Sequence, residues 1–226
     1  MNFLTYVMHL AGSCAVAYYS AAQIRDPKTR PNVLAEFQLA ESGSVPFLQA
    51  LSDRAAAEGD TWLAEKLAKH AAEEKRHGQI FAHALKQLDK RVRDFKRSKE
   101  NKSKERRSPF FAVYFEGYTR EQLKPAVIDW NVFMGSIYIL ELDASIDFAR
   151  MANVLPDDPA SHNLKLGMLS IAKDETGHAA YLYEAMMRRM STTQVQELVD
   201  EWRIRKVNSL MAFTGSLLQH QNTRLS

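Results

Sequence analysis

The stretch LAEKLAKHAAEEKRHGQIF, residues 63–81, decides the fold of this chain. Its apolar residues recur at the three- and four-residue steps of an amphipathic helix. They are Leu63, Leu67 and Phe81. His70, Glu74 and His77 fall on the same stripe, so three ionisable side chains are expected to point toward the core. Because a buried charge is costly without a partner, these groups need a compensating partner, and a metal cation is one such partner.

Two Glu-x-x-His motifs occur in the chain, one at Glu74 and His77 and the other at Glu175 and His178. A three-residue step places both members of each motif on one face of a helix. A single motif of this kind is common by chance. The second motif, however, also continues an apolar stripe, which runs through residues 164–182. Two motifs on apolar faces favour one polar cluster inside the protein.

The chain is expected to be all-α, because no strand-like alternation of useful length appears. Only 9 glycines and 7 prolines occur among 226 residues, and the 46% of apolar residues suffices for a core. Short turns at 58–60 and 155–159, with a long connection at about 94–118, are typical of a four-helix bundle with one crossover. Residues 1–30 are expected to form an N-terminal helical extension, and residues 31–226 the bundle with a further C-terminal helix. The expected helices span about 31–57, 61–93, 120–153, 160–190 and 191–219.

Lone acids on the other two long helices can complete the polar cluster. Glu41 and Glu141 each lie on an apolar stripe. Glu41 precedes Gly59 by 18 residues and Glu74 follows it by 15, so at 1.5 Å per residue both lie roughly 22–27 Å from the turn. Glu141 and Glu175 are similarly spaced about the second turn. Four acids and two histidines are therefore expected in one layer of the core.

This pattern resembles that of the ferritin-like di-iron carboxylate superfamily, in which two helices each supply one Glu and two others each supply Glu-x-x-His. The resemblance covers about residues 31–190. It implies two iron ions, with an iron–manganese pair or two manganese ions as alternatives, and it implies that Glu74 and Glu175 bridge them. The implied metal ligands are Glu41, Glu74, His77, Glu141, Glu175 and His178.

Four further residues lie near the expected ligands along the chain. His70 is one helical turn before Glu74, and a hydrogen-bonded core histidine is favoured over an extra metal ligand. Asp174 either holds an imidazole N–H beside the metals or is solvated. For Tyr138 and Tyr181, ordinary core packing is favoured over a role as a radical or proton relay.

Residues 42–46, Ser-Gly-Ser-Val-Pro, directly follow Glu41. Pro46 has no amide to donate to the carbonyl of Ser42, so a kink is expected in this helix. The small residues either open room for dioxygen or substrate, or they only improve packing. The sequence leaves both interpretations open.

The resemblance implies a non-haem di-iron oxidase or monooxygenase that activates dioxygen on a small organic substrate. Cys14 is the only cysteine, so the chain lacks the four thiolates of a rubredoxin-type centre, and an external reductase or ferredoxin is expected as electron donor. One alternative is ferritin-like or rubrerythrin-like iron storage or peroxide detoxification. Another is a tRNA-hydroxylase-like enzyme that uses the basic segment 90–107, which carries ten basic and three acidic side chains. A solvated linker is favoured for that segment, so nucleic acid is not expected as a partner.

The N-terminal segment has no charged side chain between residues 1 and 23, but it contains polar residues such as His9 and Ser13. A helix packed on the bundle or on a partner subunit is favoured over a membrane span, and a homodimer is compatible with that arrangement. The segment also lacks the basic start of a secretory signal. Together with the single cysteine, this favours a cytoplasmic protein.

Overall fold

The computed structural model describes residues 3–88 and 108–225, and within these ranges the chain forms seven helices and no β-strand. The expected all-α class is confirmed. The basic segment 90–107, and with it much of the expected crossover, lies outside the described residues. The helices are α1 (Phe3–Arg25), α2 (Arg30–Ala57), α3 (Thr61–Gln87), α4 (Pro109–Tyr114), α5 (Trp130–Val154), α6 (Pro159–Met187) and α7 (Thr192–Leu225).

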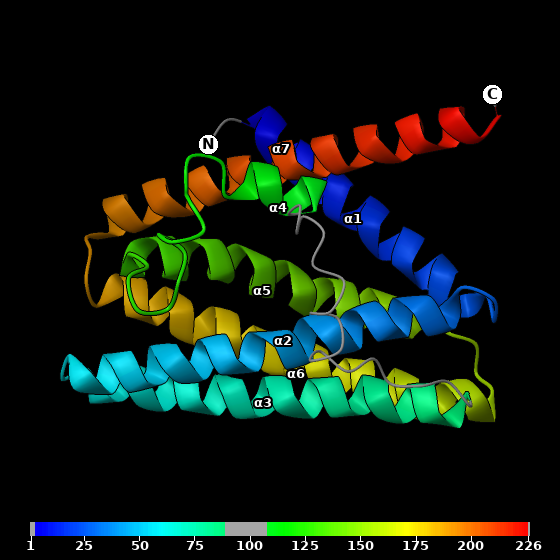
Figure 1. Cartoon of the computed structure of the whole chain (residues 1–226), viewed down its shortest axis with the longest axis horizontal. Coiled ribbons are helices and arrows are strands. Elements are labelled where there is room, and N and C mark those ends of the chain that lie inside the picture. The colour runs from blue at the N-terminus through cyan, green and yellow to red at the C-terminus, as the bar shows by residue number, and fades with distance from the viewer. Residues whose placement is uncertain (1–2, 89–107, 226) are drawn as a thin grey trace.

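Two helical hairpins form the main body of the protein (Figure 1). α2 lies along α3, α5 lies along α6, and contacts between α3 and α6 join the hairpins into a helical bundle. The first hairpin turns at Gly59, whose φ of +85° is accessible to glycine without steric cost. Asp60 then caps α3 by accepting the amide of Leu63. In the second hairpin, Asp158 caps α6 by accepting the amide of Ser161.

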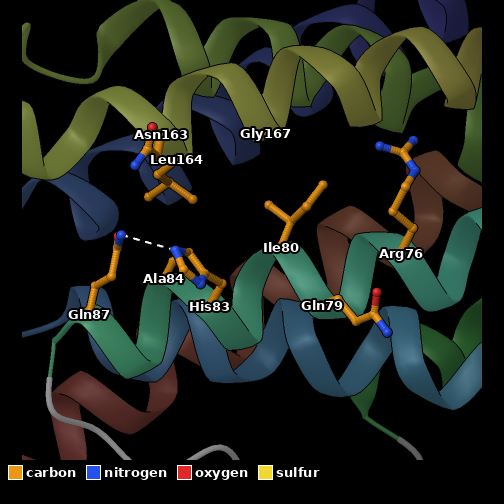
Figure 2. A pocket seen from close by; sticks show the side chains of 9 residues that line it. All are labelled: Arg76, Gln79, Ile80, His83, Ala84, Gln87, Asn163, Leu164 and Gly167. Atoms are coloured by element: carbon orange, nitrogen blue, oxygen red, sulfur yellow. Dashed lines mark hydrogen bonds between the residues drawn. The ribbon is translucent and has the colours of Figure 1, made fainter.

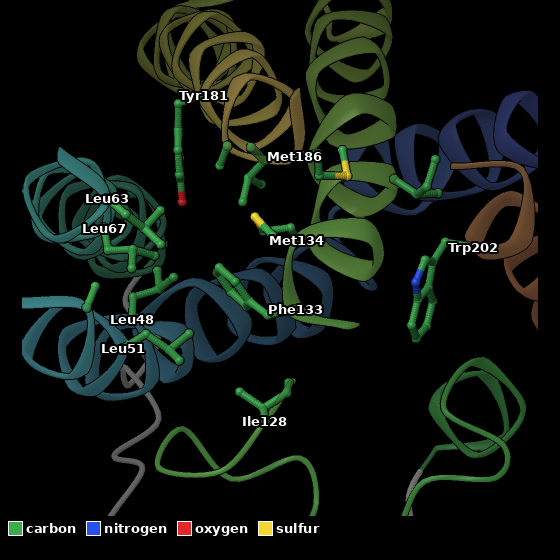
Figure 3. Close-up of a cluster of buried hydrophobic side chains, with 14 of the residues drawn as sticks. Leu48, Leu51, Leu63, Leu67, Ile128, Phe133, Met134, Tyr181, Met186 and Trp202 are labelled. Carbon is green, nitrogen blue, oxygen red and sulfur yellow. The ribbon is translucent and has the colours of Figure 1, made fainter. Parts of the chain in front are cut away.

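Two clusters of buried apolar side chains lie on either side of a polar layer. On α2, for example, Glu41 lies between Leu34 of one cluster and Leu48 of the other. The first apolar cluster includes Leu48, Leu51, Leu63, Leu67, Phe133, Met134, Tyr181, Leu182 and Met186 (Figure 3). The second includes Leu34, Phe81, Phe148, Met151, Leu164, Met168 and Ile171. Each fully buried leucine contributes about 1.5–3 kcal/mol to folding, so these clusters can offset the cost of the polar layer between them.

The N-terminal helix α1 packs against α5, α7 and α2. At its contact with α5, the buried Asp143 accepts hydrogen bonds from His9 Nε2 at 2.7 Å and Ser13 Oγ at 2.9 Å, and it pairs with Lys206 of α7. Burial alone would raise the pKa of Asp143, but His9 and Lys206 outweigh burial and lower that pKa to about 2. A buried ionic contact therefore joins α1, α5 and α7. Among the described residues, no helix has both the length and the apolar character that a membrane crossing requires.

The helix expected at about 120–153 starts later than the sequence indicates. α5 begins at Trp130, because Asp129 is extended and its carboxylate accepts the amides of Asn131 and Val132. The preceding residues form turns, and before them lies α4, which the sequence analysis did not anticipate. Its Tyr114 is fully buried and donates a hydrogen bond to a backbone carbonyl of α5 at 2.7 Å.

Other helix ends differ by a few residues from those expected. α3 ends at Gln87 rather than at about 93, and residues 89–93 lie outside the described part of the chain. α7 continues to Leu225 rather than ending at about 219. α2 is continuous through Pro46, although this residue supplies no amide to the helical hydrogen-bond ladder.

Candidate metal centre

Seven acidic and histidine side chains from α2, α3, α5 and α6 meet in the polar layer between the two apolar clusters. Two groups can each hold a metal ion, because the ligand atoms within a group all lie within 4.8 Å of one another. The His77 group consists of Glu41, Glu74, His77 and Glu175. The His178 group consists of His70, Glu74, Glu141 and His178. Glu74 belongs to both groups, so the two candidate positions adjoin.

The His77 group brings together three helices around one imidazole nitrogen. His77 Nδ1 lies 3.4 Å from Glu41 Oε2 and 3.4 Å from Glu74 Oε1. It also lies 3.3 Å from Glu175 Oε1. The His77 side chain is fully buried and the three carboxylate side chains are at most 11% exposed, so this group is largely shielded from bulk water.

The His178 group contains two imidazole rings that stack with a centroid distance of 3.6 Å, those of His70 and His178. His178 Nδ1 lies 3.8 Å from an oxygen of Glu74 and 3.8 Å from an oxygen of Glu141. His70 Nε2 lies 3.5 Å from oxygens of the same two carboxylates. Glu175 spans both groups, because its Oε2 is 3.0 Å from His178 Nδ1 while its Oε1 faces the other group.

Two further acids hold the outer nitrogens of the motif histidines. His77 Nε2 lies 3.0 Å from Asp174 Oδ2, and His178 Nε2 lies 3.1 Å from Glu73 Oε2. Each acid directly precedes the glutamate of the opposite motif, so the contacts cross between α3 and α6. A carboxylate that accepts a hydrogen bond from Nε2–H keeps the proton on that nitrogen, which leaves Nδ1 free to bind a metal and orients the ring. Asp174 is among the residues expected from the sequence to lie near the ligands, whereas Glu73 is not, although both motifs are preceded by an acid.

His70 has one hydrogen-bonded nitrogen and one free nitrogen. Its Nδ1 lies 2.8 Å from the hydroxyl of Tyr181, as expected for a hydrogen-bonded core histidine. Its Nε2 nevertheless points at the carboxylates of Glu74 and Glu141 in the His178 group. The sequence favours a hydrogen-bonded core histidine over a metal ligand at this position, and it does not predict this second contact. Tyr181 is buried and contacts the candidate site only through this histidine among the contacts described.

Tyr138 lies elsewhere. It is half-buried, and its ring packs against Tyr183 with a centroid distance of 5.7 Å. Burial raises its pKa. Its described ring contact is therefore with another tyrosine and not with a residue of either ligand group.

The small residues after Glu41 contribute to close packing at the site. Ser44 Oγ lies 2.9 Å from Glu74 Oε2 and 2.6 Å from the carbonyl oxygen of Glu41. A Cβ atom at Gly78 would collide with Ser42 Oγ, so the small residues allow α2 and α3 to approach closely beside the ligands. These contacts favour the packing interpretation of residues 42–46.

The carboxylates of the cluster stabilise positive charge on the neighbouring histidines. Burial alone would lower the pKa of His77, but the neighbouring carboxylates, Glu175 foremost, raise that pKa to about 11. The same balance, with Glu141 foremost, raises the pKa of His178 to about 10. Burial and the charge of Glu141 raise the pKa of Glu175 to about 7, and burial raises that of Glu41 well above its usual range. In the absence of a metal the layer therefore retains protons that divalent cations would replace.

Two orphaned nitrogen atoms test whether the residues fit a metal pair. His70 Nε2 and His77 Nδ1 are buried and have no hydrogen-bond partner. One belongs to each ligand group, and each faces carboxylate oxygens at 3.3–3.5 Å. Buried polar atoms without partners are rare in folded proteins, and a metal ion in each group would satisfy both. The donor set therefore fits two cations.

No protein-family model, curated protein or solved structure matches the chain.

The structure brings all six expected ligands together and adds His70 as a seventh group member. Of the other neighbours considered, Asp174 contacts a histidine of the site and Tyr181 contacts His70, whereas Tyr138 contacts neither group in the hydrogen bonds and ring contacts described. Two further residues also contact the groups: Glu73 contacts His178, and Ser44 donates a hydrogen bond to Glu74.

Proposed function

We propose that this chain is a ferritin-like di-iron carboxylate protein that uses its metals to activate dioxygen on a small organic substrate. The observation that carries this proposal is the pair of adjoining ligand groups, which share Glu74 and are enclosed by apolar clusters. The four glutamates and the two motif histidines project from four helices into the bundle core, which matches the donor pattern of this superfamily.

The metal positions follow from the ligand groups. Glu41, His77 and Glu175 would hold one ion, and Glu141 and His178 the other, with Glu74 belonging to both groups. His70 would add a second imidazole to the His178 group. Mixed oxygen and nitrogen ligands suit iron or manganese, and the absence of thiolates in both groups argues against a structural zinc site.

When bound, a pair of ferrous ions would supply the electrons and the Lewis acidity for the reduction of dioxygen. The protein's part is to position and shield. Asp174 and Glu73 orient the two motif histidines and keep their Nε2 atoms protonated. Ser44 holds one oxygen of Glu74, and Tyr181 holds the orientation of His70. The apolar clusters limit the access of bulk water to the layer.

A rubredoxin-type centre, one iron ion held by four thiolates, could supply electrons from within a chain, but Cys14 is the single cysteine here. We therefore propose an external electron donor, together with a small-molecule substrate and dioxygen, as the partners of this protein. The cytoplasm, where such donors are kept reduced, is the proposed compartment.

Anaerobic titration with Fe(II) tests this function. We expect about two ions per chain, seen by metal analysis and by Mössbauer spectroscopy of bound ⁵⁷Fe. Exposure to dioxygen should then oxidise both ions and produce new visible absorption. The variant Glu74→Ala, which removes the shared ligand, should lose both ions. If wild-type protein takes up no iron, the proposal is wrong.

The same preparation separates the alternatives. A cage-sized assembly that accumulates far more iron than two ions per chain would indicate storage. Rapid consumption of hydrogen peroxide without any need for dioxygen would indicate a peroxidase. Either result would replace the oxygenase proposal while leaving the metal centre in place.

A further inference from the structure

The seam between α3 and α6 carries a chain of contacts from the candidate centre to the surface. His77 Nε2 meets Asp174 Oδ2 at 3.0 Å, and Asp174 forms an ion pair with Arg76. Arg76 also donates to Ser170 Oγ at 3.0 Å, and 43% of its side chain is exposed. One carboxylate therefore separates a buried histidine of the centre from a cation at the surface.

A second chain of contacts runs to the same seam from the other ligand group. His178 Nε2 meets Glu73 Oε2 at 3.1 Å. The other oxygen of Glu73 pairs with Lys69 Nζ at 3.0 Å, and the Lys69 side chain is 70% exposed. Each motif histidine is thus connected to an exposed cationic side chain through one carboxylate. Arg76 and Lys69 are seven residues apart on α3, two turns along one face.

Beside Arg76 the seam opens into a groove with a volume of about 280 Å³ (Figure 2). Ile80 points across it toward α6, where Gly167 leaves room, because a Cβ atom there would lie 2.5 Å from Ile80 Cγ2. Polar side chains, including His83 and Gln87, flank the apolar floor, and no carboxylate lines the groove. An apolar floor beside an exposed arginine is a composition found at protein–protein interfaces.

We propose that this α3–α6 face, defined by Lys69, Arg76 and the groove, is the docking surface for an acidic electron-transfer protein. The inference rests on the proposed function, which requires electrons from outside the chain. In each ion pair the cation is the more exposed member, Arg76 at 43% against 18% for Asp174 and Lys69 at 70% against 19% for Glu73, so a partner with surface carboxylates would meet the cations first and be oriented by them. On the opposite side of the bundle, α5 is covered by α1 and α7. Each reduced one-electron donor is oxidised as it reduces one ferric ion, so two transfers return two ferric ions to ferrous.

Stopped-flow reduction of the iron-loaded, air-oxidised protein tests the proposal, with a reduced acidic [2Fe–2S] ferredoxin as the probe. The test variant is Lys69→Gln/Arg76→Gln, which removes both cations without placing a new charge beside Asp174. The matched control is Lys28→Gln/Lys124→Gln, which removes two exposed lysines away from the seam. At low salt we expect the test variant to be reduced about tenfold more slowly than wild type, and the control at the wild-type rate. Added salt should slow the wild type much more than the test variant.

Two further measurements keep the outcomes distinct. Reduced methyl viologen, a small donor that needs no docking surface, should reduce wild type and test variant within about twofold of each other, which shows that the centre is intact. Binding of oxidised ferredoxin, measured by fluorescence without any electron transfer, should weaken about tenfold in the test variant alone. Equal ferredoxin rates in wild type and test variant would overturn the docking proposal, as would salt-dependent RNA binding at this face in place of ferredoxin binding. If iron does not bind at all, the proposed function fails, whereas the ferredoxin-binding measurement still decides the docking surface.

Discussion

His70 Nδ1 lies 2.8 Å from the hydroxyl of Tyr181, and this contact turns His70 Nε2 toward the carboxylates of the His178 group. An imidazole has only two nitrogens, so fixing one in a hydrogen bond determines where the other points. A tyrosine that does not itself belong to a ligand group thereby helps to define that group.

Tyr181→Phe removes this orienting contact and leaves Nδ1 of a buried histidine unpaired. We expect metal affinity of the His178 group to fall about tenfold, as for other residues that orient a ligand. The free energy of unfolding should fall by about 1–3 kcal/mol. Chelator competition and denaturant unfolding measure the two effects, with the more exposed Tyr183→Phe as the control. Unchanged affinity would show that Tyr181 serves packing alone.

His70→Leu distinguishes a metal ligand from a hydrogen-bonded core histidine. We expect the variant to bind one ion as tightly as wild type and the second at least about tenfold more weakly, because only the His178 group loses a donor. The control is His83→Leu, an exposed histidine more than three turns further along the same helix, which contacts only Gln87 among the hydrogen bonds described. Equal binding of two ions by His70→Leu and wild type would remove His70 from the ligand set.

Asp174→Asn and Glu73→Gln test the crosswise contacts to the motif histidines. Each neutral amide is a weaker acceptor for an imidazole N–H, so the opposite motif's histidine loses orientation and basicity. We expect affinity for one ion to fall about 10–100-fold in each single variant. Isothermal titration with Mn(II), which avoids oxidation, measures the loss. The exposed Glu65→Gln on the same helix as Glu73 should bind as wild type does.

The stability of the metal-free protein should fall as pH rises. The folded pKa values of His77, about 11, and His178, about 10, exceed the ordinary value of 6.5. Their contribution is therefore complete below about pH 6.5 and is lost as pH rises through 10 to 11. The pKa of Glu175 is about 7 in the folded protein against an ordinary value of 4.5, so its contribution to stability is also lost as pH rises from about 4.5 through 7. Thermal unfolding at pH 5, 7 and 9 should give a falling Tm.

Metal loading should reverse this trend. Divalent cations replace the protons held by the layer, so metal affinity rises with pH and the loaded protein gains stability over the metal-free form most strongly at pH 9. A metal-free Tm that stays level or rises between pH 5 and 9 would contradict the assigned charges of His77 and His178.

Gly78→Ala tests the close approach of α2 and α3 beside the ligands. The new methyl group would collide with Ser42, and overpacking of this kind costs about 1–3 kcal/mol of unfolding free energy. Gly177→Ala is the matched control, since nothing lies within 4 Å of a Cβ there and alanine favours the helix by about 1 kcal/mol. The free energy of unfolding, measured with denaturant, should therefore fall in Gly78→Ala and rise in Gly177→Ala. Equal effects would mean that Ser42 moves aside readily.

Much of the bundle and its polar layer is predictable from local pattern. The periodicity around Glu74 and Glu175 identifies the buried helix faces, and counting residues from Gly59 places Glu41 and Glu74 at one level, because the rise per residue of a helix is nearly constant. The start of α5 is less predictable, since the competing cap at Asp129 shortens a segment whose composition alone suits a helix.

The sequence by itself determined that four helices carry acids on their apolar faces and that two of them also carry histidines there, because that depends only on helical periodicity. Tertiary structure alone decided that Asp174 reaches His77, that Glu73 reaches His178, and that His70 faces the carboxylates rather than only the core. It also decided that α1 is joined to α5 and α7 through Asp143. These contacts depend on how far each helix is rotated about its axis and on how closely the helices approach, and packing between helices sets both quantities.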